Sequence, residues 1–342
     1  MQAVVFPEPG KIEIQNVPHP EPGPEEVLVR TRRAGLCGTD LNIHRGEYDA
    51  SYPLIPGHEL CGEVAAFGEN VSGWELGQRV AVDPNLDCGH CDFCRRQQNN
   101  HCRYWQGVGI TRPGGFADYF VVPARAVYHL PDTVSDTEGA FVEPLSCAVH
   151  AMERLAVRPG ASALIFGAGP MGLLLAQMLG RNGAGRVVVV DKLEERLELA
   201  EEMGATETVL VDAQEHLILK GLEPNGYAIV ADATGVPAVV ESAWQYLRPY
   251  GQYLQFGVTP KNATVPLNPY QLFRHDWTLV GSFALCYDFP KAIALLATQA
   301  VDVGPLVSHT LPLTEFEHGF NAFVAGDTLK VQYVPAVDGS NG

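Results

Sequence analysis

The chain has 342 residues, which exceeds the usual domain size of roughly 100 to 200 residues, so we expect two domains. A formal net charge of −17 with only 23 Lys and Arg residues excludes a nucleic-acid-binding surface, which needs clustered basic side chains. No run approaches the roughly 20 apolar residues that span a membrane, and the strand-like start lacks a signal peptide, so we expect a cytoplasmic protein outside membranes.

The order of predicted elements changes near the middle of the chain. Alternating segments broken by Gly and Pro predict strands at residues 11–17, 26–32, 60–67, 79–82 and 115–122. Later, apolar strands alternate with helical patterns, at residues 163–166, 187–190, 228–230 and 252–256. We therefore expect a β-rich domain at 1–147 and a parallel, doubly wound α/β domain at 148–275. Residues 276–342 are expected to complete the second domain and return to the first.

The segment Gly167-Ala168-Gly169-Pro170-Met171-Gly172 has the G-x-G-x-x-G spacing of a dinucleotide-binding turn. It follows an apolar strand and opens a helical pattern, which is the setting that this motif requires. Its glycines permit a tight turn and close backbone approach, and the free N–H groups of a helix start attract a pyrophosphate. A purely structural turn is the alternative.

Asp191 follows the second strand of this region, about 20 residues after the motif, where a carboxylate accepts hydrogen bonds from the adenosine ribose. Because a carboxylate repels a 2′-phosphate, NAD is favoured over NADP. Lys192 and Arg196 lie close in sequence and could bind a 2′-phosphate, so NADP is the alternative cofactor. The alternative for Asp191 is an acid at the end of a strand with no role in binding.

Cys88, Cys91, Cys94 and Cys102 form the pattern C-x2-C-x2-C-x7-C within a lobe of about residues 85–105. Four thiolates in one loop suit a closed tetrahedral zinc site with a structural role. An iron–sulfur cluster uses the same four ligands and is an alternative that the sequence does not exclude. A disulfide pair and four free thiols are two further alternatives.

A second group of metal-binding residue types is dispersed along the first domain. It comprises Cys37 in Cys37-Gly38-Thr39-Asp40, the pair His58 and Glu59, and Glu143 in Glu143-Pro144-Leu145-Ser146. Taken singly, each residue is more often a packing or surface residue than a ligand.

Three features together resemble the medium-chain dehydrogenase family, and within it the zinc-containing polyol dehydrogenases that act on sorbitol, xylitol or arabitol. Gly57-His58-Glu59, with Gly62, Gly68 and Val71, matches the signature G-H-E-x2-G-x5-G-x2-V, and the cysteine lobe and glycine motif follow in family order. The resemblance covers essentially the whole chain. It implies a GroES-like catalytic domain, a Rossmann domain, two zinc ions, NAD, and a homotetramer or homodimer that oxidises a secondary alcohol of a polyol to a ketose.

The resemblance also implies roles for the dispersed residues. Cys37 and His58 would bind the catalytic zinc, with Glu59 as a direct or intermittent ligand. Glu143 stands where alcohol dehydrogenases have a cysteine ligand, and the run that it begins is the one that polyol dehydrogenases carry. A harder carboxylate ligand should make the metal a stronger Lewis acid.

Proton transfer and cofactor contacts follow from the same resemblance. Thr39 would hydrogen-bond the substrate oxygen and begin proton export. Related enzymes have histidine five residues after the zinc cysteine, whereas this chain has Asn42 there and His44 two residues later. Either His44 replaces that relay, or the proton leaves through water and the cofactor ribose. The nicotinamide would be lined by Thr234, Gly257, Val258, Ser282 and Phe283.

One departure from the family pattern, and the alternative functions, concern the substrate. Sorbitol-specific relatives follow the last motif with Arg-Tyr, and this chain has Ala284 and Leu285, so the resemblance implies the polyol class and not sorbitol itself. The alternatives are an L-threonine 3-dehydrogenase-like or general secondary-alcohol dehydrogenase, and a non-catalytic nucleotide-binding relative. The run that begins at Glu143 argues against the threonine type, and retention of all the dispersed ligands argues against a non-catalytic protein.

Overall fold

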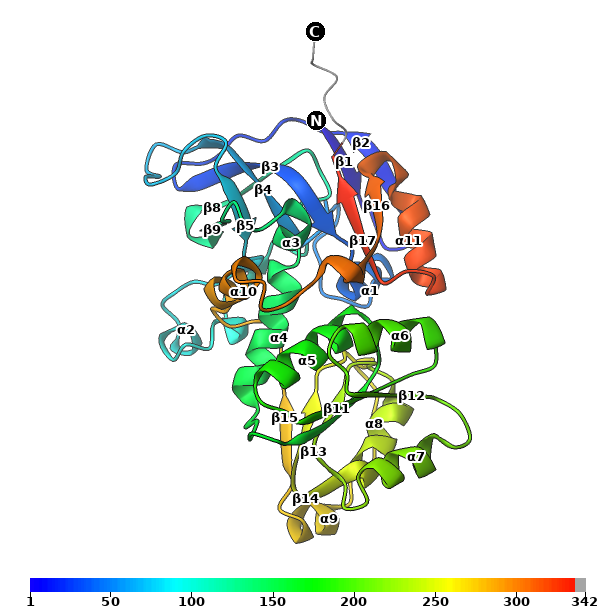
Figure 1. The fold of residues 1–342 in the computed structure, drawn as a ribbon. Helices are drawn as coiled ribbons and strands as arrows, with labels where there is room; N and C mark the ends of the chain where they lie inside the picture. Colours follow the sequence, from blue (N-terminus) through cyan, green and yellow to red (C-terminus); the bar gives the residue numbers. More distant parts are fainter. Residues whose placement is uncertain (336–342) are drawn as a thin grey trace. The chain divides into compact units, whose positions relative to one another are not determined.

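The computed structural model describes residues 1–335, and its internal contacts divide the chain into two compact units (Figure 1). The first unit is Met1–Ser146 together with the returning segment from Cys286, and the second is Cys147–Leu285. Within the described residues, no helix is long and apolar enough to cross a membrane.

The first unit is built on a seven-stranded sheet in the order β16-β17-β3-β4-β5-β9, with β8 also paired to β3. Its strands are β3 (Glu26–Gly35), β4 (Glu59–Phe67), β5 (Arg79–Val82), β8 (Tyr119–Pro123), β9 (Val127–His129), β16 (Val307–Pro312) and β17 (Lys330–Val334). Two further pairs are β1 (Gln2–Val5) with β2 (Glu13–Asn16), and β6 (Asn85–Leu86) with β7 (Gln106–Gly107). Valine and aromatic side chains from one face of this sheet form a single core.

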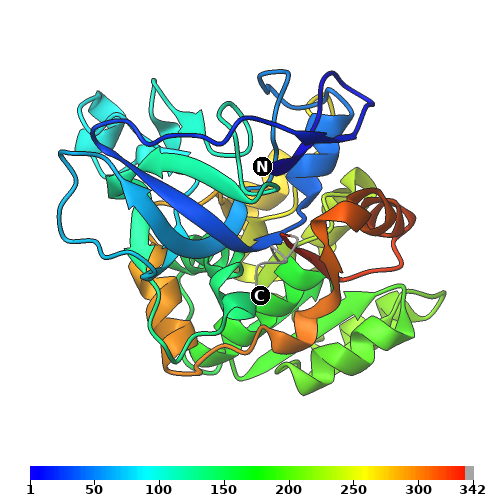
Figure 2. The same ribbon diagram turned by 90° about the horizontal axis from the view of Figure 1, so that it is seen from above.

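Short helices and turns complete the first unit. The α-helices are α1 (Gly38–His44), α2 (Asp92–Arg95), α3 (Asp136–Gly139), α10 (Phe289–Ala297) and α11 (Phe316–Ala325). The 3-10 turns are η1 (Asn99–His101), η2 (Ala124–Ala126), η4 (Gly304–Leu306) and η5 (Leu313–Glu315). Helix α11 packs against β16 and β17, as both Figure 1 and the view from above in Figure 2 show. Its Phe316 and Phe320 extend the sheet's core.

The second unit is a six-stranded parallel sheet in the order β12-β11-β10-β13-β14-β15. The strands are β10 (Ser162–Phe166), β11 (Arg186–Asp191), β12 (Glu207–Leu210), β13 (Tyr227–Asp232), β14 (Leu247–Gln255) and β15 (Thr278–Gly281). Strands β10 and β13 are buried along their whole length, as the continuous apolar runs of a sheet covered on both faces require.

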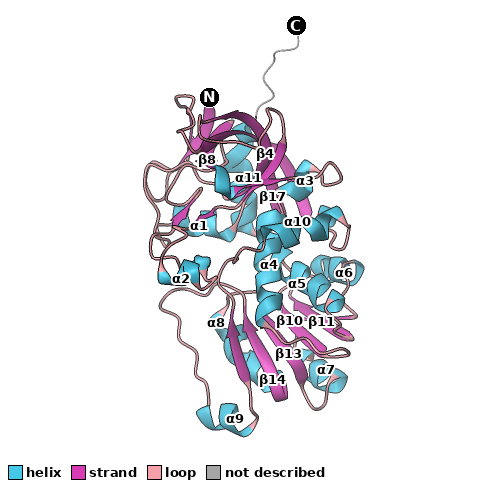
Figure 3. Ribbon diagram, turned by 90° about the vertical axis from the view of Figure 1, so that its left-hand side faces the viewer, coloured by secondary structure: helices cyan, strands magenta, loops and turns pink. Residues whose placement is uncertain are grey.

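Helices flank the parallel sheet (Figure 3). They are α5 (Pro170–Arg181), α6 (Glu194–Glu202), α7 (Glu215–Leu222), α8 (Pro237–Ala243) and α9 (Pro269–Arg274), with the turn η3 (Trp244–Tyr246). Helix α4 (Val142–Arg154) begins in the first unit and ends in the second. Because β10 is flanked by β11 and β13, the chain reverses direction across the sheet there, and open α/β sheets bind ligands at such a switch point.

The predicted α/β fold class is confirmed, with a β-rich unit followed by a doubly wound one. The strand predicted at 115–122 is wrong for its first residues, because β8 begins only at Tyr119. There Gly115 and Phe116 donate their N–H groups to Gly57 and Pro56, in the segment before β4, and join no strand ladder. That pairing depends on a segment about 60 residues away, which local alternation does not reveal.

Candidate active site

Cys37, His58 and Glu59 come together in the first unit, with one ligand atom of each within 4.8 Å of the others. Cys37 is the N-cap residue of α1, and Glu59 is the first residue of β4. The β3–β4 ladder pairs Gly35 directly with Glu59, so the loop that leaves β3 meets the segment that enters β4. Strand pairing therefore fixes the position of Glu59 and brings the neighbouring His58 close to the segment that contains Cys37.

The chemistry of this donor set fits zinc. A thiolate, an imidazole and a carboxylate are the three side-chain types that bind zinc, with bonds of about 2.0 to 2.3 Å. His58 and Glu59 are buried, and their donor atoms lie close enough to Cys37 to share one ion. The group can therefore hold a zinc ion between two buried side chains and the half-buried Cys37.

Asp40, which sequence reasoning did not single out, supports two of these residues. Its Oδ2 accepts a hydrogen bond from the backbone N–H of Cys37 at 2.9 Å, and its Oδ1 lies 3.5 Å from His58 Nδ1. Burial opposes charge on the imidazole, but Asp40 and Cys37 raise the pKa of His58 well above its usual value. The Nδ1 atom is buried and has no hydrogen-bond partner among residues 1–335, and a metal bound by the imidazole competes with its proton.

Lys330 was also missed, because it is far from the motif in sequence and lies on β17. Its Nζ donates to both carboxylate oxygens of Glu59, each at 2.7 Å, and to the carbonyl oxygen of Leu36 at 3.1 Å. Burial opposes its charge, but the Glu59 carboxylate more than compensates and raises the pKa of Lys330. Glu59 of the metal-binding group therefore also belongs to a buried ion pair with Lys330.

Glu143 does not belong to the set of mutually close donor atoms. It lies in the first turn of α4, and its negative charge acts on Lys330 and on Tyr48. Burial is the main reason that the pKa of Tyr48 is raised, and Cys37 and His58 also act on this hydroxyl. Glu143 and Tyr48 therefore belong to the surroundings of the centre, and ligation by Glu143 stays a prediction.

The two predicted proton-transfer residues lie in different environments. Thr39 Oγ1 is 3.7 Å from Cys37 Sγ, so this hydroxyl adjoins the metal-binding group. The His44 ring packs edge-on against Phe6 and Phe320, with centroid distances of 5.4 and 5.0 Å. Burial lowers the pKa of His44 below its usual value. The relay role of His44 stays a prediction, and its contacts are those of a packed aromatic ring.

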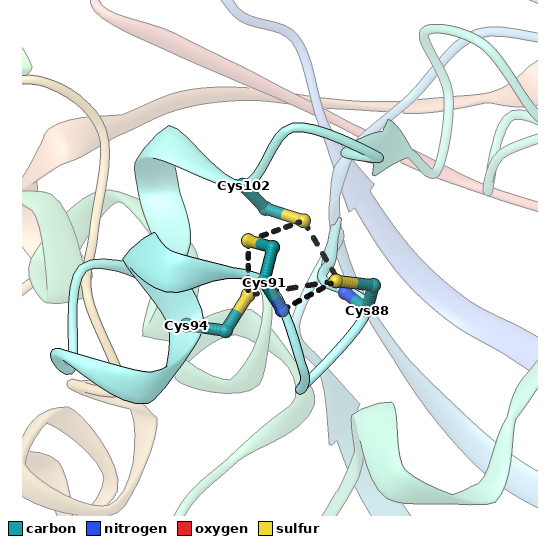
Figure 4. A group of neighbouring side chains, drawn as sticks. All are labelled: Cys88, Cys91, Cys94 and Cys102. Atoms are coloured by element: carbon teal, nitrogen blue, oxygen red, sulfur yellow. Dashed lines mark hydrogen bonds between the residues drawn. The ribbon is translucent and has the colours of Figure 1, made fainter.

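The cysteine lobe brings four sulfurs around one point (Figure 4). The Sγ atoms of Cys91 and Cys94 are 3.4 Å apart, those of Cys88 and Cys94 3.9 Å, and those of Cys91 and Cys102 4.0 Å. A zinc ion with four Zn–S bonds of about 2.3 Å places its sulfurs about 3.8 Å apart. Disulfide bonding needs about 2.05 Å, and an iron–sulfur cluster would hold the thiolates farther apart around its own atoms. The geometry fits a single tetrahedral ion.

Backbone amides donate hydrogen bonds to sulfurs in this lobe. The N–H groups of Cys91 and Cys88 donate to Cys88 Sγ and Cys102 Sγ, each at 3.3 Å. A hydrogen bond from the backbone of Cys94 is the main cause that lowers the pKa of Cys91, whereas burial raises the pKa of Cys94 and of Cys102 in the absence of an ion. Amide donors and four buried or half-buried thiols fit a closed metal site.

In the second unit, the glycine motif forms the turn between β10 and α5. Gly167 has a φ of +103°, and a Cβ on Gly172 would lie 1.8 Å from the Gly167 carbonyl oxygen, so both positions require glycine. A Cβ on Gly169, the N-cap residue of α5, would point into open space. Pro170, Met171 and Gly172 form the first turn of this 12-residue helix. The turn therefore offers free N–H groups and room for a pyrophosphate.

Asp191 ends β11 and faces this turn. Its Oδ2 accepts a hydrogen bond from Ala168 N at 2.7 Å, and its Oδ1 accepts one from Leu193 N at 3.1 Å. The carboxylate is thus held beside the glycine turn with lone pairs left for further donors. Lys192 is exposed beside it, and Arg196 lies in the first turns of α6.

Asp232, a fully buried acid that sequence reasoning missed, organises the predicted nicotinamide-lining segments. Its Oδ1 accepts hydrogen bonds from Thr234 N at 3.0 Å and Thr234 Oγ1 at 2.6 Å. The second oxygen accepts one from Gly235 N, and a Cβ on Gly257 would lie 2.7 Å from it. Its place at the carboxyl end of β13, next to β10, is a signal that sequence reasoning could have used.

The remaining predicted lining residues follow β14 and β15. Val258 and Phe283 are exposed apolar side chains. Ser282 Oγ is buried and has no hydrogen-bond partner among residues 1–335. Exposed apolar groups and an unpaired hydroxyl suit a ligand with an apolar ring and a polar amide.

Two family models match the chain. Residues 23–132 match the alcohol dehydrogenase GroES-like domain, and residues 170–298 match the zinc-binding dehydrogenase. The chain is 34% identical to D-arabinitol dehydrogenase 1 of Uromyces fabae, over 98% of this chain and 97% of that protein. It is 37% identical to D-altritol 5-dehydrogenase of Agrobacterium fabrum (97% and 99%) and 32% identical to L-threonine 3-dehydrogenase of Idiomarina loihiensis (92% and 94%).

Solved structures agree with these matches. A zinc-binding dehydrogenase from Sinorhizobium meliloti 1021, bound to NADP, superposes with a TM-score of 0.94 at 33% identity, over 98% of this chain and 99% of that one. An alcohol dehydrogenase from Escherichia coli CFT073, complexed with NADH, gives a TM-score of 0.92 at 28% identity over the same shares. The chain therefore belongs to the zinc-binding medium-chain dehydrogenase family, close to its polyol dehydrogenases, and is an oxidoreductase that uses zinc and a nicotinamide dinucleotide.

Proposed function

We propose that the protein oxidises a secondary alcohol of a polyol to a ketose and transfers the hydride to NAD. The observation that carries this proposal is the group of Cys37, His58 and Glu59, the last two of them buried, in a chain that also has the glycine turn at Gly167. Relatives named for D-arabinitol and D-altritol support the polyol class. The Glu143-Pro144-Leu145-Ser146 run supports it independently.

The residues of the first unit perform the binding and proton steps. Bound zinc supplies a Lewis acid, which lowers the pKa of a coordinated hydroxyl much as it lowers that of water from 15.7 to about 7. Cys37 and His58 would hold the ion, with Glu59 as a direct or intermittent ligand and Glu143 as a further proposed ligand, and Asp40 lies beside the imidazole. The Thr39 hydroxyl receives the alcohol proton and passes it onward, by His44 or by water.

The residues of the second unit bind and orient the dinucleotide. N–H groups of the turn from Gly167 to Gly172 bind the pyrophosphate, and Asp191 accepts hydrogen bonds from the adenosine ribose. Thr234, Gly257, Val258, Ser282 and Phe283 contact the nicotinamide end. Asp232 is a positioning residue here, because it fixes the backbone of Thr234 and Gly235.

A panel of alcohols tests the substrate class. We expect reduction of NAD with pentitols, hexitols or tetritols at kcat/KM values at least about tenfold above those with L-threonine or simple secondary alcohols, because a tenfold preference needs only about 1.4 kcal/mol of extra transition-state binding. Initial rates followed by NADH absorbance give the comparison. Preference for L-threonine would support the threonine dehydrogenase alternative, and the absence of turnover with every alcohol would contradict the proposal.

Cofactor choice is tested by Asp191→Asn, which removes the charge and keeps one acceptor oxygen. Repulsion between two unit charges about 4 Å apart is worth about 1 to 4 kcal/mol at a protein surface, so the NAD-over-NADP ratio of kcat/KM should fall roughly tenfold to several hundredfold. Glu202→Gln, an exposed charge loss on α6, is the matched control and should leave the ratio unchanged. An unchanged ratio in Asp191→Asn would mean that Asp191 does not face the ribose.

Assembly and location complete the proposal. We expect a homotetramer or homodimer, and sedimentation velocity distinguishes the two. Strand β15 is an edge of the parallel sheet and carries the partly exposed Leu279, with exposed Tyr270 and Phe273 on α9, which supports association through the second unit. A cytoplasmic location is supported by the dependence of both metal sites on free thiols, which a reducing compartment preserves.

A further inference from the structure

Gln255 is the last residue of β14, at the edge of the parallel sheet where the predicted nicotinamide-lining segments begin. In the parallel ladders it is the direct partner of Asp232 on β13 and of Gly281 on β15. The loops that follow these three neighbouring strands carry the residues assigned to the nicotinamide end of the dinucleotide. Gln255 therefore lies at the point from which all three loops can be reached.

Gln255 makes a hydrogen bond to each of the three loops. Its side-chain Nε2 donates to Asp232 Oδ2, at the start of the loop after β13, at 2.8 Å. The same nitrogen donates to the Gly257 carbonyl oxygen, in the loop after β14, at 2.7 Å. Its backbone carbonyl oxygen accepts a hydrogen bond from Ser282 N, in the loop after β15, at 3.2 Å. One residue thus connects the three loops.

The orientation of the Gln255 amide is fixed by its partners. Both partners of Nε2 are oxygens that only accept, and the Tyr253 hydroxyl donates to Oε1 at 2.8 Å. Burial, together with the nearby Asp232 carboxylate, raises the pKa of Tyr253, so this hydroxyl stays protonated and able to donate. The Trp244 ring packs against the Tyr253 ring, with centroids 4.3 Å apart. The amide therefore has a single orientation.

Satisfying the buried Asp232 carboxylate does not explain this glutamine. Asp232 already accepts hydrogen bonds from the backbone and hydroxyl of Thr234 and from Gly235 N, all within its own loop. What the amide adds is the connection to the next loop. The two loops pass very close to each other, since a Cβ on Gly257 would lie 2.3 Å from Gly235 N. A displacement of one loop is therefore transmitted to the other.

We propose that Gln255 is a positioning residue that holds the loops after β13, β14 and β15 in one arrangement and so places the nicotinamide for hydride transfer. This inference rests on the proposed function, which assigns these loops to the nicotinamide. Loops that are connected before the cofactor binds need not be ordered at the moment of binding, so affinity is gained. The adenosine half is assigned to the turn at Gly167 and to Asp191, and within residues 1–335 Gln255 makes no hydrogen bond to either.

The test compares the binding of NADH with that of ADP-ribose, which lacks the nicotinamide, in holoenzyme that carries Gln255→Leu. We expect the Kd for NADH, measured by calorimetry, to rise about 10- to 100-fold, where each tenfold step equals about 1.4 kcal/mol, because a hydrogen bond to a charged group is lost. The Kd for ADP-ribose should change less than about twofold, because its contacts lie elsewhere. Equal losses for both ligands would indicate a general structural defect, and unchanged NADH binding would show that the connection is dispensable. Either result overturns the proposal.

Two further variants separate the connection from an effect on folding. Gln255→Leu leaves the buried Tyr253 hydroxyl without its acceptor, whereas Gln255→Leu combined with Tyr253→Phe removes both groups together. The double variant should show the same selective loss of NADH affinity, and wild-type NADH binding in it contradicts the proposal even if the single variant fails to fold. Tyr253→Phe alone keeps both bonds of the amide nitrogen and should weaken NADH binding less than Gln255→Leu does.

Gln252→Leu is the matched control. Gln252 lies on the same strand, and its side-chain amide makes two hydrogen bonds to the backbone of Ala156, both at 2.9 Å, away from the three loops. This variant removes a glutamine of the same strand that also connects two segments. It should change neither Kd, and a selective loss of NADH affinity here would contradict the assignment to Gln255.

Hydride transfer gives a second measurement. With saturating cofactor and alcohol, kcat of Gln255→Leu should fall roughly 10- to 100-fold, because a misplacement of about 1 Å in the reacting groups has an effect of that size. If wild-type protein binds NADH no more tightly than ADP-ribose, these loops do not hold the nicotinamide and the inference fails. If it binds NADH more tightly but oxidises no polyol, only the substrate class is wrong, and the binding comparison still decides the role of Gln255.

Discussion

Cys37→Ser is expected to abolish alcohol oxidation while dinucleotide binding stays unchanged. Loss of the thiolate removes a ligand of the catalytic ion, whose Lewis acidity contributes several kcal/mol to the reaction, so kcat/KM should fall on the order of a thousandfold or more. Serine is a favourable N-cap residue, so α1 should persist. Initial rates, NADH fluorescence titration and metal analysis give the comparison, with zinc content falling from two ions per chain to one.

Cys61→Ser provides the matched control for that substitution. Cys61 is buried in the same unit, lies outside both metal-binding groups, and donates its Sγ hydrogen bond to the Asp136 carbonyl oxygen, which a hydroxyl also does. It should retain near-normal turnover and both ions. Near-normal rates in Cys37→Ser would show that catalysis does not proceed through this centre.

Cys94→Ser is expected to destabilise the lobe between β6 and β7 and to lower the thermal midpoint by about 10 °C or more. The two strands have two residues each, and the lobe's buried cluster consists of Cys91, Cys94 and Cys102 with few partly buried neighbours. The ion must therefore supply the folding energy that a core would otherwise give, and structural zinc in small peptides contributes about 10 to 16 kcal/mol. Each lost kcal/mol lowers the midpoint by about 2 to 4 °C in a unit of this size.

Thermal unfolding, limited proteolysis and metal analysis test this expectation. Cleavage should concentrate between residues 88 and 104, and the variant should retain a single ion. Cys286→Ser is the control, because Cys286 Sγ donates to the Gln97 carbonyl oxygen beside the lobe without joining the four thiols. A Cys94→Ser variant with two bound ions and an unchanged midpoint would contradict the assignment of a structural site.

The nucleotide-binding unit could be predicted from local sequence because its determinants are local. Gly167 and Gly172 are required by φ and by backbone contact within a single turn, and Asp191 ends the very next strand. The four-cysteine metal site could also be predicted from the sequence, since all its ligands lie within one loop. The dispersed residues Cys37, His58 and Glu143 could be assigned as ligands only from the family resemblance, because sequence spacing does not show which residues so far apart come together in the fold.

The sequence by itself therefore determined the α/β class, the order of the two units, the glycine turn and the cysteine lobe, all from short-range spacing. Tertiary structure alone decided which residues support the metal centre. Strand pairing brings Lys330 from the far end of the chain to Glu59, and Gly35 leaves the space that their contact needs. Asp40 and Asp232 were within motifs already noted or next to them, but their roles depend on burial, which only the packed fold creates. A charged group that water solvates at the surface needs an ion-pair or hydrogen-bond partner when it is buried, and the fold determines which residue is that partner.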